Sequence, residues 1–123
     1  MKSLFFVFLG GGIGAVVRYL IGTFFQLFYS GNFPYSTLTA NIIACLLVGV
    51  FAFIFDDFRW INQYSRLFFV VGVCGGLSTF STFSLETLNL FKSGNFYLAI
   101  FNVFISILGC LVVLFLLYKR FKI

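Results

Sequence analysis

The residues best able to do chemistry in this chain lie in one short segment, residues 75–86. Its sequence, GGLSTFSTFSLE, combines two glycines, five hydroxyl side chains, two phenylalanines and one carboxylate. The flanking residues are almost entirely apolar. In lipid every buried polar group needs a partner, so a polar cluster in apolar surroundings indicates a binding site or a path for an ion.

Long uncharged stretches indicate that the chain is embedded in a lipid bilayer. Of its 123 residues, 62% are apolar and 9% are charged, whereas about a quarter are charged in soluble domains. No charge occurs in residues 19–55, 67–85 or 93–118. A membrane-spanning helix needs about 20 mostly apolar residues. We therefore expect a multi-pass protein of a cell membrane.

Four helices are expected, which together form a single all-α domain over residues 1–123. The turn formers at 30–34 and 92–95 and the hydrophilic loop at 56–66 separate them. Ser36 or Thr37 is a plausible cap at the start of the second helix. The expected spans are residues 4–28, 37–55, 67–91 and 96–118.

Enzymatic activity is not expected. The chain has no histidine and only three carboxylates, two of them adjacent in a loop, which leaves little for acid–base catalysis. Cys45, Cys74 and Cys110 lie in apolar runs without metal-ligand spacing, so we expect neither a disulfide nor zinc. The glycines of residues 10–15 match a dinucleotide motif only formally, since no βαβ unit follows. No nucleic-acid partner is expected.

Two polar residues inside the first two spans each have two interpretations. Arg18 either extends its guanidinium to the headgroups or lines an aqueous vestibule that attracts anions. Asn41 either links helices through its amide or offers N–H donors to an anion. The small residues at 10, 14, 40, 44 and 49 pack closely either between subunits or within one.

The third span carries a predicted break. Gly75 and Gly76 precede hydroxyl residues, and a membrane helix that unwinds there would free carbonyls able to bind a cation. Phe80 and Phe83 are three residues apart and share one face of the helix that follows. Spacing alone favours packing or lipid contact for these rings. Presented edge-on, however, their positive edges would line an anion path.

Three regions of the sequence resemble the Fluc (CrcB) family of fluoride channels, and the resemblance covers almost the whole chain. The segment at 75–86 matches the family signature closely, and residues 11–19 and 34–41 match in the right order. The resemblance implies an antiparallel, dual-topology dimer of four-helix subunits with a broken third helix and two fluoride pores. It also implies a central structural sodium ion, held by backbone carbonyls of Gly75 and Ser78 from both subunits.

The resemblance further implies roles along the pore. Phe80 and Phe83 would form its aromatic lining, and Asn41 would donate to fluoride. Arg18 would belong to the vestibule. The polar track would comprise Thr79, Ser81, Thr82, Ser84 and Glu86. On the fourth helix Cys110 and Leu114 stand where hydroxyl residues are expected, so either this stretch of the path is weakened or it uses Ser106 and Asn102 instead.

Positive charge is distributed unevenly between the two ends of the expected bundle. The end with the termini and the long loop carries six basic residues, and the opposite end carries Lys92 alone. Such a bias favours one orientation, with the termini in the cytoplasm. The partner is therefore either a second copy or an oppositely oriented homologous subunit. The six are Lys2, Arg59, Arg66, Lys119, Arg120 and Lys122.

The expected function is a passive, fluoride-selective channel that confers fluoride resistance by efflux. The alternative is a small four-span multidrug-type cation exporter, which would need a membrane-embedded carboxylate, typically in the first helix. Here the first span contains Arg18 and no acid. A membrane assembly subunit without transport activity is a third possibility, which the polar third span disfavours.

Overall fold

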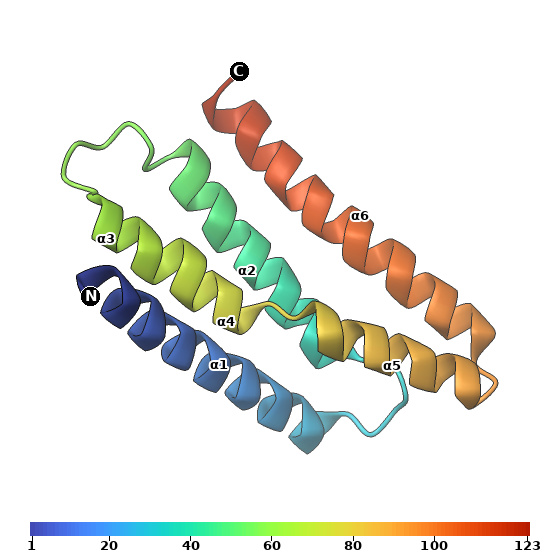
Figure 1. Ribbon diagram of the computed structural model, residues 1–123. Helices are drawn as coiled ribbons and strands as arrows, with labels where there is room; N and C mark the ends of the chain where they lie inside the picture. Colours follow the sequence, from blue (N-terminus) through green and yellow to red (C-terminus); the bar gives the residue numbers. More distant parts are fainter.

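The computed structural model describes residues 1–123 and is entirely helical (Figure 1). Helices α1 (Lys2–Phe28), α2 (Tyr35–Phe53) and α6 (Phe96–Phe121) are continuous, and a composite helical segment, Gln63–Lys92, lies between α2 and α6. Each of the four is long and apolar enough to cross a membrane. The four predicted spans are therefore confirmed. The expected cap at Ser36 or Thr37 is wrong, because Pro34 precedes the first turn of α2.

The third span consists of four segments: α3 (Gln63–Arg66), the π-helix η1 (Leu67–Cys74), α4 (Gly75–Leu77) and α5 (Phe80–Lys92). Between α4 and α5 the backbone is extended at Ser78 (φ −78°, ψ 153°) and Thr79 (φ −151°, ψ 122°). The sequence predicts a break over Gly75 to Ser78. The extended residues are Ser78 and Thr79, whereas Gly75 is helical (φ −65°, ψ −37°). Gly76 serves packing instead, since a Cβ there would meet the Gly11 carbonyl of α1.

Both termini and the long loop lie at the same end of the bundle (Figure 1). Lys122 Nζ is 3.1 Å from Asp57 Oδ2, which ties the C-terminus to the loop. The rings of Phe6 and Tyr64 lie 5.4 Å apart and bring the N-terminus to the same place. The predicted gathering of six basic residues at one end therefore agrees with the fold.

Small residues pack within the chain. Gly10 and Gly14 are buried where α1 meets η1 and α4, and a Cβ at either position would collide with backbone atoms of the third span. Ala40, Ala44 and Leu77 form the buried core beside this contact. Of the two interpretations of the small-residue spacing, the structure supports close packing inside one subunit.

A buried hydrogen-bond network links α5 to α6. Thr87 Oγ1 donates to the Phe83 carbonyl (2.8 Å) and accepts from Asn102 Nδ2 (2.9 Å). Ser106 Oγ donates to Asn102 Oδ1 (3.3 Å). Asn102 and Ser106, which the sequence offered as members of a polar track, are thus used at least in part to join helices. In the absence of water such a network restricts the pairing of these helices to one register.

Replacing Ser106 by alanine removes the last bond of this network. We expect the free energy of unfolding to fall by about 1 kcal/mol, since a neutral hydrogen bond has that net value. Thermal unfolding in detergent measures the change. Ser30→Ala, at an exposed loop position, is the control and should leave the unfolding temperature unchanged. An equal loss in both variants would contradict a role for the network.

Candidate functional site

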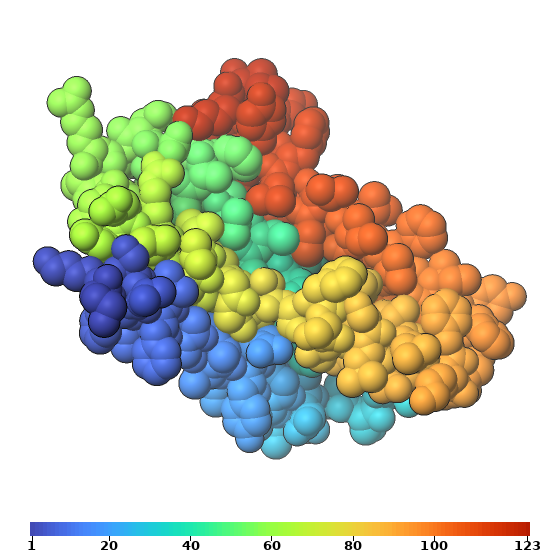
Figure 2. Space-filling model, in the orientation of Figure 1, coloured from blue at the N-terminus to red at the C-terminus, as the bar shows by residue number.

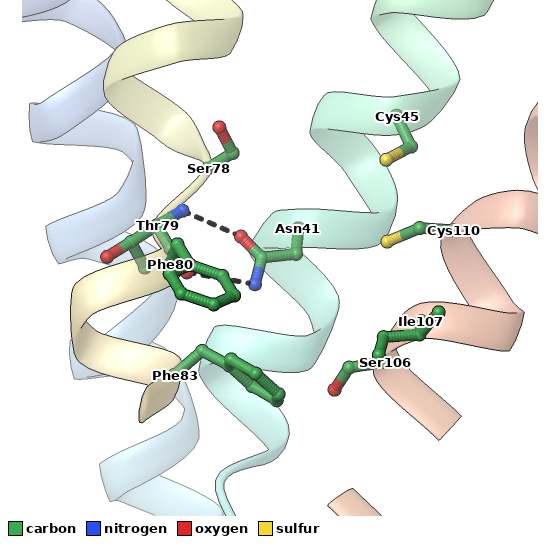
Figure 3. Close-up of a pocket in the computed structure, with 9 residues that line it drawn as sticks. All are labelled: Asn41, Cys45, Ser78, Thr79, Phe80, Phe83, Ser106, Ile107 and Cys110. Carbon is green, nitrogen blue, oxygen red and sulfur yellow. Dashed lines mark hydrogen bonds between the residues drawn. The ribbon is translucent and has the colours of Figure 1, made fainter. Parts of the chain in front are cut away.

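The interruption of the third span is held by the side chain of Asn41. The Thr79 N–H donates to Asn41 Oδ1 (2.8 Å), and Asn41 Nδ2 donates to the Thr79 carbonyl (3.3 Å), as Figure 3 shows. In a continuous helix the Thr79 N–H would bond the Gly75 carbonyl. The amide of Asn41 therefore satisfies the backbone groups that the interruption exposes. This supports the helix-linking interpretation of Asn41, and its second amide hydrogen remains for another acceptor.

Freed carbonyls at the interruption fit a hard cation. Because Thr79 bonds Asn41, the Gly75 carbonyl has lost its helical donor. The Thr82 N–H, which would bond the Ser78 carbonyl in a continuous helix, instead donates to Thr79 Oγ1 (3.2 Å), which leaves the Ser78 carbonyl outside the helical pattern. Gly75 is exposed, and nothing would contact a Cβ there. Figure 2 shows this yellow part of the chain at the surface, where a second subunit can approach.

One cavity, of about 280 Å³, lies between α2, α5 and α6 (Figure 3). Phe83 is 9% exposed and Phe80 is 79% exposed, and their ring centroids are 5.7 Å apart. Both rings line this cavity, which agrees with the prediction that they share a face. Its wall consists of Asn41, Cys45, Ser78, Thr79, Phe80, Phe83, Ser106, Ile107 and Cys110.

A second cavity, of about 160 Å³, has no hydrophobic residue in its lining. Within it Thr37 Oγ1 donates to Glu86 Oε1 (2.8 Å). Arg18 Nε and Glu86 Oε2 are buried there without a hydrogen-bond partner in the chain. Burial of Nε favours the interpretation of Arg18 as a cavity-lining cation over extension to the headgroups. The lining is Arg18, Gly22, Ser36, Thr37, Thr79, Thr82 and Glu86.

Thr79 lines both cavities and lies at their junction. Its side chain also caps α5 by accepting from the Thr82 N–H (3.2 Å). Of the other predicted hydroxyls, Thr82 lines the polar cavity, whereas Ser81 and Ser84 are exposed and line neither cavity. Ser81 Oγ lies 3.5 Å from Thr79 Oγ1, and Ser84 Oγ donates to the Phe80 carbonyl of its own helix (2.9 Å). The structure thus gathers Asn41, Phe80 and Phe83 on one side of Thr79.

Thr37, Cys45 and Ser36 are among the lining residues that the sequence prediction of the site missed. Thr37 holds Glu86, and the only signal for it was its position one turn before Asn41, on the same helix face. Cys45 and Ser36 line the cavities but carry no recognisable pattern. The resemblance places Leu114 at a position of the polar track. In the structure Leu114 packs against Gly49 of α2, where a Cβ on the glycine would lie 3.2 Å from the leucine side chain.

The comparisons with known proteins all point to one family. Residues 5–118 match the family described as CrcB-like protein, Camphor Resistance (CrcB). A protein of Phocaeicola vulgatus named Fluoride-specific ion channel FluC is 48% identical over 94 residues, covering 76% of this chain and 77% of its own. One of the same name from Clostridium perfringens is 46% identical over 102 residues, covering 83% and 79%.

A third protein of that name, from Elusimicrobium minutum, is 40% identical over 124 residues and covers all of this chain and 96% of its own length. The matches extend over every span and both cavities. The chain is thus a multi-pass protein of the bacterial plasma membrane and not an enzyme, and it belongs to the CrcB family.

Proposed function

We propose that this chain forms a passive, fluoride-selective channel that lowers cytoplasmic fluoride by efflux. The observation that carries the proposal is the pair of cavities that meet at Thr79, one polar with Arg18 and one lined by Asn41, Phe80 and Phe83. Relatives spanning nearly the same length are named fluoride-specific ion channels. Hydrogen fluoride enters as a neutral acid and ionises inside, so the membrane potential drives the anion outward.

The electrostatics of the two cavities suit an anion that must lose part of its hydration shell to enter the pore and must not bind so tightly that it cannot exit. The guanidinium of Arg18 raises the local concentration of anions in the polar cavity. Beyond Thr79 the wall contains no fixed charge, so the ion is not trapped. There an amide hydrogen of Asn41 and the positive edges of aromatic rings replace part of its hydration.

The start of α5 adds a further favourable field. Thr79 is its N-cap and Phe80 its first residue, so the positive end of the helix dipole lies beside the cavity. Backbone N–H groups in the first turn of a helix have no intrahelical acceptor and attract anions. An interrupted span therefore supplies donors in the middle of the chain's third crossing, where an unbroken helix would supply none.

The proposed assembly is an antiparallel dimer with two pores and a sodium ion between the subunits. Carbonyls of Gly75 and Ser78 from each subunit would hold the ion, since these groups lie outside the helical pattern at the exposed interruption. A bound cation supplies positive charge that fixes the extended backbone. The partner is a second copy or, given the charge bias, an oppositely oriented homologue.

The experiment is anion flux from liposomes containing the purified chain. We expect fluoride release far above protein-free liposomes and no matching chloride release. Equal rates for the two ions would refute selectivity. Flux that requires co-reconstitution with a homologous subunit would establish the heterodimer.

Phe83→Leu keeps an apolar side chain but removes the aromatic edge. We expect fluoride flux to fall by about two- to tenfold, the equivalent of the 0.5–1.5 kcal/mol of a specific aromatic contact. Size-exclusion chromatography should show an unchanged assembly. Phe8→Leu, exposed on α1 and remote from either cavity, is the matched control. Loss of assembly in Phe83→Leu with normal flux per folded protein would instead indicate a packing role.

A further inference from the structure

Two cysteines lie in the wall of the cavity that contains Phe80 and Phe83. Figure 3 shows Cys45 on α2 and Cys110 on α6, one above the other, with both sulfur atoms on the cavity side. Both thiols are free, and no disulfide joins them. The third cysteine, Cys74, is buried elsewhere and lines neither cavity.

Contacts on both sides keep the two helices close at this point. One turn before Cys45, Ile42 lies 3.5 Å from the position that a Cβ on Gly109 would occupy. One turn after it, Gly49 packs against Leu114 and Leu117. Since α2 and α6 run in the same direction, these contacts flank the cysteines along both helices (Figure 1). The two helices are therefore in close contact on both sides of the cysteines.

Two thiols without a further ligand suit one kind of ion. The chain has no group of three or more His, Cys, Asp or Glu side chains that could hold a metal, so the tetrahedral site that structural zinc requires is not formed. Soft thiolates select soft cations such as Cu(I) over the hard ions that oxygen ligands prefer. A soft ion that accepts two ligands needs only this pair.

We propose that Cys45 and Cys110 form a two-thiolate site for a soft, two-coordinate cation of the Cu(I) class. Each coordinating thiol releases its proton to water, and no electron transfer takes place. The bound ion sits in the cavity wall, where it occupies part of the volume and replaces neutral thiols by thiolates. If fluoride passes through this cavity, which rests on the proposed function, the bound ion obstructs it.

Binding is tested by calorimetry of the purified full-length chain with silver nitrate in chloride-free detergent buffer. Silver is a soft monovalent cation that does not change oxidation state here. We expect one tightly bound ion per chain in the wild type and in Cys74→Ala. Cys45→Ala and Cys110→Ala should each lose the tight binding. Equally tight binding by either of these two variants would overturn the site.

Obstruction is tested by fluoride release from liposomes with and without silver nitrate, each variant being compared with its own silver-free rate. We expect silver to bring the wild type and Cys74→Ala down to the protein-free background and to leave the rates of Cys45→Ala and Cys110→Ala unchanged. Undiminished flux in silver-loaded wild type would overturn the obstruction. A chain without fluoride flux would refute the proposed function, while calorimetry would still decide the site.

Discussion

Asn41→Ala is expected to lower fluoride flux by about ten- to hundredfold, because a hydrogen bond to a charged group is worth about 1.5–3 kcal/mol. The substitution removes the amide whose second hydrogen we propose donates to fluoride. It also leaves the Thr79 N–H and carbonyl without their partner at the interruption. Fluoride release from liposomes measures the change, with thermal unfolding recorded on the same preparations.

Two further variants separate the roles of Asn41. Asn41→Asp keeps an acceptor for the Thr79 N–H but removes the donor and adds negative charge, so we expect it to fold and not to conduct. Asn89→Ala, exposed on α5, is the matched control and should conduct normally. Full conduction by a folded Asn41→Asp would show that Asn41 only positions the backbone and does not face the anion.

The number and limits of the spans were predictable because they depend on local composition. A helix in lipid must satisfy its backbone internally, so an uncharged apolar stretch of sufficient length has essentially one structure available. Residues 19–55 and 93–118 each contain such a stretch, and each yields a helix close to its predicted limits. The gathering of basic residues at one end follows from the number of spans alone.

The site was predictable in composition but not in arrangement. Residue types indicated that 75–86 is interrupted, yet the extended residues are Ser78 and Thr79 and not the glycines. Glycine permits either unwinding or close packing, and the choice depends on α1, which a local pattern does not include. Thr37 and Glu86 are 49 positions apart, so their bond follows only from the packing of α2 on the third span.

Gly14→Val is expected to destabilise the fold by about 3 kcal/mol, the upper end of the usual cost of overpacking a close contact. A Cβ at Gly14 would meet the Val73 carbonyl and approach the Leu77 N–H to 2.8 Å. Both are backbone atoms, so α1 would have to move away from η1 and α4 as a unit. Since α1 also carries Arg18, this movement would open the polar cavity.

Thermal unfolding and size-exclusion chromatography in detergent measure this cost, and Gly12→Ala on the same helix is the control. Nothing lies within 4 Å of a Cβ at Gly12, and alanine is the better helix former by about 1 kcal/mol. The control should therefore unfold at the same temperature or higher. If Gly14→Val were as stable as Gly12→Ala, the contact of α1 with the third span would not be tight. The position of Arg18 near Glu86, which depends on that contact, would then not be fixed by it.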